Sequence, residues 1–343
     1  MIEHRGAPRI VLFGLGGTIA MAPVEGGGIA PALSPAQLVA AVPGLAETGI
    51  DLEVVDFRRL PGASLGFADV HALSVAVDAA LADGADGVVV AQGTDTLEET
   101  AYLLDLWHRG PQPVVVTGAM RNPTLAGHDG PANLLAAVRV AADPGARDLG
   151  VVVVLADEIH AARRVRKTHS TGVGAFTSPN GGPLGYLVAG RPCVLHRPDG
   201  RFGVPRPAGP PGARVGVVTA TLGDRGELLH GVEERLDGLV VAAMGVGHVP
   251  EVMVARLHEI GGAIPVVLSS RTGAGPVLTD TYAFPGSERD LLARGLVPAG
   301  FLDPVRARLL LCAALAVGAD RGALAAAFAA AGGYTSPEGW PWR

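Results

Sequence analysis

The sequence of 343 residues contains little lysine, cysteine or aromatic residue. Lys167 is the only lysine among 27 basic residues, and the others are arginines. Cys193 and Cys312 are the only cysteines and lie far apart. They form neither a disulfide framework nor a metal site, and free thiols in a reducing cytoplasm are the expected state. Aromatic residues make up 4% of the chain, which leaves few platforms for stacking nucleic-acid bases.

Long apolar runs and an excess of positive charge are also absent. The longest apolar stretch, residues 309–319, stops at Asp320, short of the roughly 18 residues that a membrane span requires. The net charge of −6 argues against nucleic acid or an anionic membrane as a partner. The first residues lack the basic start and apolar stretch of a signal peptide, so we expect a cytoplasmic protein.

What the sequence does contain is enough hydrophobic material, 48% of the residues, for a sizeable core. Short apolar runs alternate with segments of helical periodicity through the first two-thirds of the chain. This alternation predicts an α/β fold with a mostly parallel sheet. Strands are expected at 10–13, 87–91, 114–117 and 151–155, and helices at 34–42, 68–81, 97–107 and 131–142.

A break in composition divides the chain. Prolines and glycines are frequent between 192 and 211, and such a tract neither continues a helix nor enters a central strand. We therefore predict a larger N-terminal catalytic domain at 1–190, a linker at 191–213 and a smaller Rossmann-like domain at 214–343. The second domain resumes the α/β alternation, with strands at 215–218, 238–243 and 264–268 and helices near 250–260 and 304–317.

Small polar residues follow two of the expected strands of the first domain. Thr18 comes after the glycine turn that ends the first strand, and Thr94 and Asp95 follow the strand at 87–91. The glycine turn does not fit a dinucleotide site, because Ile19 stands where close helix packing needs Gly or Ala. Alternatively, these residues only cap helices, with Glu98 supporting the cap. Since parallel strands end at one edge of a sheet, the three side chains are expected to meet there.

Lys167 lies in a basic run beyond the strand at 151–155. Arginine keeps its proton near neutral pH, whereas a lysine can serve as a base once its environment favours the neutral amine. A threonine hydroxyl needs such a base before it acts as a nucleophile. Thr18, Thr94, Asp95 and Lys167 together therefore predict a hydroxyl-nucleophile site for acyl transfer, in which backbone N–H groups of the glycine turns stabilise the oxyanion.

Several of these segments resemble the signatures of bacterial-type L-asparaginases, in the right order along nearly the whole chain. They are Gly16-Gly17-Thr18-Ile19-Ala20, the run from Gly93 to Tyr102, Gly118-Ala119-Met120-Arg121, Asp129-Gly130-Pro131-x-Asn133-Leu134, the segment from Arg163 to Tyr186, and Ser269 to Gly275.

The resemblance implies two α/β domains per chain and a homotetramer, a dimer of dimers, in which the second domain of a neighbour closes each site. It implies an amidohydrolase of asparagine catabolism that needs no cofactor or metal. Thr18 would attack the side-chain amide of L-asparagine, and water would then release aspartate. Thr94, Asp95 and Lys167 would form the second catalytic group.

Substrate-binding roles are implied in the same way. Asp95 would also receive the α-ammonium group, and Ser64 the α-carboxylate. Ala119 would supply a backbone carbonyl near the amide, and Gly93, Thr94 and Leu65 complete the predicted binding residues.

Two positions depart from the family pattern. The loop after Thr18 lacks the tyrosine that helps to activate the first threonine, so either Glu25 replaces it or the loop closes differently. Leu65 stands where many members have a glutamine that hydrogen-bonds the substrate. Because leucine cannot make that bond, we expect weaker anchoring of the substrate and low activity on glutamine.

Other functions remain open from the sequence. The chain could be a dual glutaminase-asparaginase, the amidase subunit of a tRNA-dependent amidotransferase, or a non-catalytic amino-acid-binding regulator on the same scaffold. A dehydrogenase is a further alternative from another class. His160 beside Asp157 and Glu158 suggests a metal, but the spacing matches no standard site.

Overall fold

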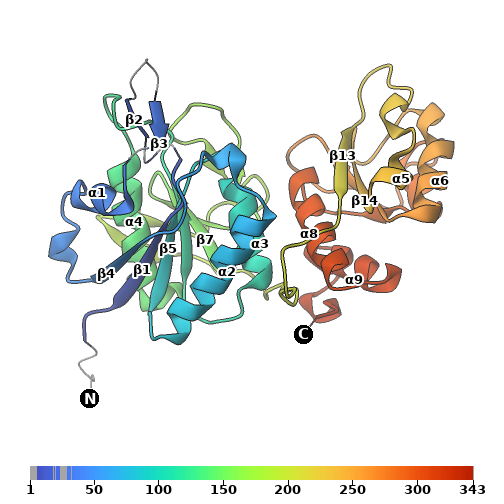
Figure 1. Ribbon diagram of the computed structural model, residues 1–343. Coiled ribbons are helices and arrows are strands. Elements are labelled where there is room, and N and C mark those ends of the chain that lie inside the picture. Colours follow the sequence, from blue (N-terminus) through green and yellow to red (C-terminus); the bar gives the residue numbers. More distant parts are fainter. Residues whose placement is uncertain (1–5, 18, 20, 24–28, 32, 343) are drawn as a thin grey trace. The chain divides into compact units, whose positions relative to one another are not determined.

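The computed structural model describes residues 6–17, 19, 21–23, 29–31 and 33–342. Thr18 and Glu25, two of the residues singled out by the sequence, lie outside the described residues. The chain forms two compact units, Met1–Asp199 and Gly200–Arg343 (Figure 1).

An eight-stranded sheet forms the centre of the N-terminal unit, in the order β12-β11-β8-β7-β6-β5-β1-β4. The strands from β4 to β7 are parallel to one another, and β8, β11 and β12 continue the sheet with antiparallel pairing. The predicted mostly parallel α/β sheet is therefore confirmed. The strands are β1 (Arg9–Gly14), β4 (Asp51–Asp56), β5 (Gly87–Ala91), β6 (Val114–Thr117), β7 (Val151–Leu155), β8 (Glu158–Ala161), β11 (Gly185–Val188) and β12 (Arg191–Val194).

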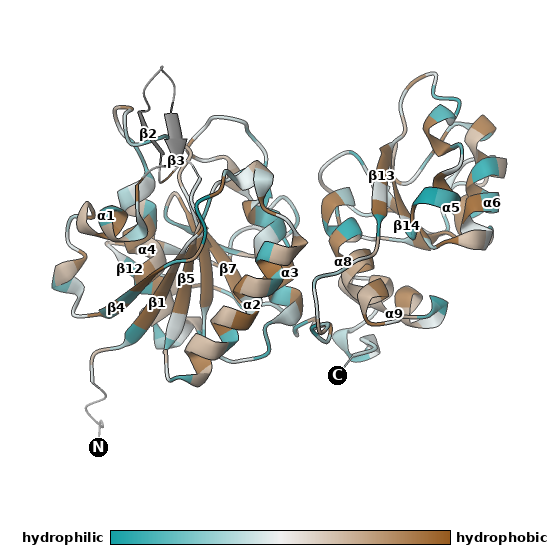
Figure 2. Cartoon of the chain, in the orientation of Figure 1, coloured by the Kyte–Doolittle hydropathy of each residue, from teal (hydrophilic) through white to brown (hydrophobic). Residues whose placement is uncertain are grey.

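The central strands are continuous apolar runs because both of their faces are covered by helices. Every residue of β5, β6 and β7 is buried, as expected of a parallel sheet between two helical layers. Helices α1 (Pro35–Ala40) and α4 (Gly130–Ala142) pack on one face, and α2 (Phe67–Ala82) and α3 (Leu97–Trp107) cover the other (Figure 1). Figure 2 shows the same central strands as the most hydrophobic part of the unit.

Two short antiparallel pairs complete the strands of this unit. They are β2 (Met21–Pro23) with β3 (Ile29–Pro31), and β9 (Arg166–Lys167) with β10 (Phe176–Thr177). The second pair brings Lys167 opposite Phe176.

Both edge strands of the large sheet differ from the expectation. No strand is predicted from sequence at β4, because its pattern Asp51-Leu-Glu-Val-Val-Asp56 is acidic. An edge strand half open to solvent tolerates these charges. Strand β12 falls within the segment expected to be linker, and its Pro192 is compatible with an edge position. The first compact unit accordingly ends at Asp199, beyond the expected boundary at 190.

The C-terminal unit has a separate, wholly parallel sheet in the order β13-β14-β15-β16. Helix α6 shares a core with Leu239 and Val241, whereas Leu311 of α8 lies against Gly238. Since neighbouring residues of a strand face opposite ways, the two helices cover opposite faces. The elements are β13 (Val215–Thr219), β14 (Gly238–Ala243), β15 (Val266–Ser270), β16 (Val297–Pro298), α5 (Val232–Arg235), α6 (Val254–Ala263), α7 (Glu288–Ala293), α8 (Pro304–Ala316) and α9 (Arg321–Ala331).

Among the residues that the structure describes, none of the helices combines the length and the apolar character needed to cross a bilayer.

Candidate active site

Three of the predicted site residues meet at the carboxyl edge of the large sheet. Lys167 Nζ lies 2.9 Å from Thr94 Oγ1 and 3.0 Å from Asp95 Oδ1. The Thr94 side chain is buried, whereas the Asp95 side chain is 65% exposed and so remains open to a ligand. The hydroxyl, the amine and the carboxylate thus form one hydrogen-bonded unit between segments that are more than 70 residues apart in sequence.

The position of Lys167 depends on a residue to which the sequence analysis gave no part in the site. Glu98, in the first turn of α3, accepts a hydrogen bond from the Lys167 backbone N–H at 2.7 Å. The neighbouring residue, Thr168, is held by its N–H to the Ala175 carbonyl at 2.7 Å. Because these contacts use the backbone, the Lys167 side chain stays available for Thr94. Only the proximity of Glu98 to Asp95 in sequence could have suggested this role.

The helix-cap interpretation of Thr94 and Asp95 is wrong. The residue at the N-cap position of α3 is Thr96, and its hydroxyl donates to the Gly62 carbonyl at 2.8 Å instead of capping the helix. The Glu98 carboxylate accepts the Lys167 backbone N–H. The polar residues after β5 therefore connect neighbouring loops, and none of their hydroxyls caps the helix.

Three loops cross closely at the same edge. A Cβ atom at Gly17 would lie 2.1 Å from the Cα of Gly93, and one at Gly62 would lie 3.0 Å from the Gly93 carbonyl oxygen. Gly17 also has a φ of +84°, a conformation that favours glycine. Backbones can approach this closely only without side chains, so the glycines bring the ends of β1, β4 and β5 together.

The predicted substrate-binding residues Ser64 and Leu65 belong to the loop that carries Gly62. Ser64 ends a short 3₁₀ turn, Gly62–Ser64, and its side chain is exposed. Leu65 follows directly and is half-buried. Because Gly62 lies against Gly93, this loop borders the one that holds Thr94 and Asp95.

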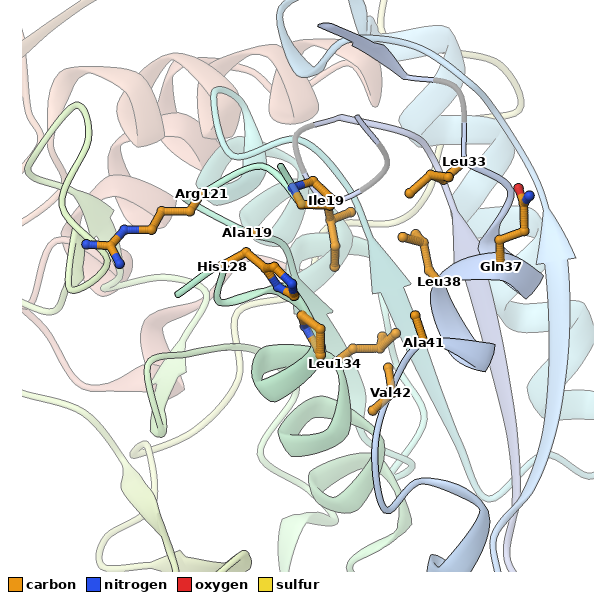
Figure 3. Close-up of a pocket in the computed structure, with 13 residues that line it drawn as sticks. Ile19, Leu33, Gln37, Leu38, Ala41, Val42, Ala119, Arg121, His128 and Leu134 are labelled. Atoms are coloured by element: carbon orange, nitrogen blue, oxygen red, sulfur yellow. The ribbon is translucent and has the colours of Figure 1, made fainter. Parts of the chain in front are cut away.

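Ala119 lies in the loop after β6 and is fully buried. The loop packs directly on Thr94, since a Cβ atom at the preceding Gly118 would lie 3.3 Å from Thr94 Cγ2. Figure 3 shows Ala119 beside Ile19, the residue after Thr18. The loop that carries Ala119 thus packs both against Thr94 and against Ile19, which follows the first strand.

Behind Ala119 and Ile19 is an apolar cavity of about 110 Å³. Apolar side chains from α1, α4 and the segments next to α1 form much of its wall, and Arg121 extends away from them (Figure 3). Its lining includes Leu33, Leu38, Val42, Leu134 and Pro131. The cavity offers no array of polar groups for an amino-acid substrate, so the polar unit around Thr94 is the better candidate site.

His160 is buried, and its two ring nitrogens face Ser178 and Glu158. Its Nδ1 lies 3.0 Å from Ser178 Oγ, and its Nε2 lies 3.1 Å from Glu158 Oε2 without hydrogen-bond alignment. Burial lowers the pKa of His160 to about 4 and raises the pKa of Glu158. The neutral imidazole is therefore the form that the fold favours at neutral pH.

The chain is similar to one family over nearly all of its length. The family described as Asparaginase, N-terminal matches residues 9–199, and that described as Glutaminase/Asparaginase C-terminal domain matches residues 214–328. A probable L-asparaginase of Deinococcus radiodurans is 39% identical over 322 residues, which cover 92% of this chain and 95% of that protein. An L-asparaginase of Bacillus licheniformis is 32% identical over 315 residues, covering 90% and 95%.

A solved structure shares the fold. The crystal structure of a probable cytoplasmic L-asparaginase from Campylobacter jejuni superposes with a TM-score of 0.83 at 32% sequence identity. The match covers 94% of this chain and 99% of that one.

Proposed function

The chain belongs to the asparaginase family, and from this premise we propose that it is an amidohydrolase that converts L-asparagine and water into L-aspartate and ammonia. The observation that carries the proposal is the hydrogen-bonded unit of Thr94, Asp95 and Lys167. A lysine held against a buried threonine hydroxyl, beside an exposed carboxylate, suits acyl transfer from an amide.

The proposed reaction has two steps. In the first, the Thr18 hydroxyl attacks the side-chain carbonyl; an ester C–O bond forms, the C–N bond breaks, and the nitrogen leaves as ammonia after gaining a proton. In the second, water attacks the ester, releases aspartate and returns the proton to Thr18. Thr94, aligned by Lys167 and Asp95, moves protons during these steps.

We propose a binding group near this unit for each part of asparagine. We assign the exposed Asp95 carboxylate to the α-ammonium group and the exposed Ser64 hydroxyl to the α-carboxylate. The Ala119 carbonyl receives an N–H of the side-chain amide. Leu65, half-buried in the Ser64 loop, adds an apolar contact where a hydrogen bond would otherwise anchor the substrate.

A dual glutaminase-asparaginase is the second candidate, because the matching C-terminal family carries both activities in its description. Leu65 favours the narrower specificity. Glutamine is one methylene longer and depends more on anchoring of its α-substituents, and leucine offers none by hydrogen bonding. We therefore expect low glutaminase activity.

The assembly and the location stay predictions. A homotetramer, a dimer of dimers, is expected, and light scattering of the purified protein tests it. A cytoplasmic location and a role in asparagine catabolism are likewise expected, with no nucleic acid as a partner. Cell fractionation tests the location.

The proposed activity is tested by measuring ammonia release from L-asparagine and L-glutamine side by side. Rapid release from asparagine and slow release from glutamine is the expected result. Comparable rates would discard the specificity assigned to Leu65. No release from either by a folded oligomer, with asparagine binding detected by calorimetry, would favour a non-catalytic amino-acid-binding regulator.

A further inference from the structure

The backbone around Ala119 is held by two side chains at the start of α4. Asp129 immediately precedes that helix, yet its carboxylate makes no cap hydrogen bond to it. The carboxylate instead accepts the N–H of Met120 at 3.0 Å and the N–H of Arg121 at 2.8 Å. Asp129 therefore fixes the peptide group that joins Ala119 to Met120 and the one that joins Met120 to Arg121.

Asn133, one helical turn further on, holds the preceding peptide. Its buried amide nitrogen donates to the Gly118 carbonyl at 3.0 Å and to Asp129 Oδ2 at 2.9 Å. Its Oδ1 accepts the N–H of Ala156 at 3.0 Å. Ala156 adopts a φ of 50° in the turn between β7 and β8, so the same amide also supports a strained turn.

Ala119 itself is left without such a partner. Within the described part of the chain no hydrogen bond reaches the Ala119 carbonyl oxygen, although the residue is fully buried. An unpaired buried carbonyl is costly, and proteins keep such groups where a ligand or water satisfies them. The carbonyl belongs to the peptide group whose N–H, that of Met120, is held by Asp129, and the preceding peptide group is held by Asn133.

We propose that Asp129 and Asn133 are positioning residues that aim the Ala119 carbonyl at the N–H of the scissile amide. This inference rests on the proposed function, in which that carbonyl receives the substrate amide. The two residues do not touch the substrate; they hold the acceptor in a fixed place, so that its hydrogen bond costs no reorganisation when the substrate binds.

The test compares an amide with an ester. L-Aspartate β-methyl ester presents the same acyl group as asparagine but has no N–H for the Ala119 carbonyl. In Asp129→Asn, an NH₂ group replaces one carboxylate oxygen. This donor faces the backbone N–H groups of Met120 and Arg121 and cannot accept their hydrogen bonds. We expect kcat/KM on asparagine to fall about 10- to 100-fold and that on the ester to change less than about threefold.

Asp320→Asn is the matched control. Asp320 precedes α9 and caps it by accepting the Ala323 N–H, a role that asparagine also fills well. Both activities should stay unchanged in this variant. Hydrogen exchange at Met120 and Arg121, which should quicken in Asp129→Asn alone, reports whether the loop has been released. Asn133→Ser, which removes the donor to Gly118, provides a second variant should Asp129→Asn fail to fold.

The outcomes separate the two proposals. If the wild-type protein hydrolyses neither substrate, the proposed function fails. If the wild type hydrolyses both substrates, two results overturn the positioning role. The folded variants either lose both activities equally or lose neither activity. Selective loss of the amide reaction supports it.

Discussion

Both units have hydroxyl side chains at or just after the carboxyl ends of parallel strands, but Thr94 differs from Ser269 and Ser270 in the partner of its hydroxyl. In the C-terminal unit, Ser269 donates to the Leu302 carbonyl and Ser270 to the Gly245 carbonyl, so both bind backbone. In the N-terminal unit, the Thr94 hydroxyl instead meets a lysine side chain. A hydroxyl at the edge of a parallel sheet is thus not enough for a site; it needs a titratable partner.

The difference in hydroxyl use predicts the largest effect. Thr94→Val keeps the shape of the side chain but removes the oxygen, and we expect kcat/KM on asparagine to fall about 10³-fold with little change in stability. Ser269→Ala should leave kcat/KM unchanged and lower the free energy of unfolding by about 1 kcal/mol, because only a structural hydrogen bond is lost. Ammonia assays and urea unfolding measure both. Equal losses of activity would remove the distinction between the two edges.

Two glycines, one in each unit, allow the units to be compared by the stability cost of a Gly→Ala substitution. Gly17 and Gly275 have nearly equal φ values, +84° and +82°, but an added Cβ atom would clash with another backbone only at Gly17. Gly275→Ala should cost about 1 kcal/mol from its conformation alone. Gly17→Ala adds a clash that no side-chain rotation relieves, and should cost about 3 kcal/mol or more. Similar midpoints of chemical unfolding for the two variants would argue against the close crossing of loops.

Acid should destabilise the N-terminal unit through His160. Burial lowers its pKa from 6.5 to about 4, so between these values only the unfolded chain takes up the proton. The free energy of unfolding therefore falls as pH drops from 6.5 to 4, by up to about 3 kcal/mol from this group. His160→Asn keeps a polar group for Ser178 and should flatten this part of the pH dependence. Unfolding curves of the wild type and the variant at pH 7 and pH 4.5 test this prediction. An equal loss of unfolding free energy in the two proteins would exclude His160 as the cause.

The smallest expected effect concerns Leu65. Leu65→Gln restores a hydrogen-bonding side chain to the Ser64 loop, and one such bond contributes about 0.5–1.5 kcal/mol. We expect KM for asparagine to fall about 2- to 10-fold and activity on glutamine to rise. Leu65→Met, which matches the size without the polar group, should change neither. A glutamine variant with unchanged KM values would show that Leu65 does not face the substrate.

The central strands and most of the helices packed on them could be predicted from sequence because their composition is extreme. Runs such as Val151–Leu155 are apolar throughout, which only a doubly covered sheet requires. Strand β4 could not be predicted in the same way, since its acidic edge pattern resembles a loop. The strand β12 was hidden by Pro192, which is unusual in strands away from a sheet edge.

The site was predictable to the extent that its chemistry depends on residue type. A single lysine, and threonines after buried strands, indicated Lys167 and Thr94 before their contact was known. The parts played by Glu98, Asp129 and Asn133 were not predictable, because each binds the backbone of another segment. The i, i+4 spacing of Asp129 and Asn133, which places them on one side of a helix, was the only local signal.

The central claim is that Thr94 and Lys167 act as one unit, and a double-mutant cycle tests it most directly. Thr94→Val, Lys167→Met and the double variant are compared by kcat/KM for ammonia release from L-asparagine. If the two side chains work together, the double variant should be within about threefold of the more damaged single variant. A loss in the double variant equal to the product of the two single losses would contradict the account.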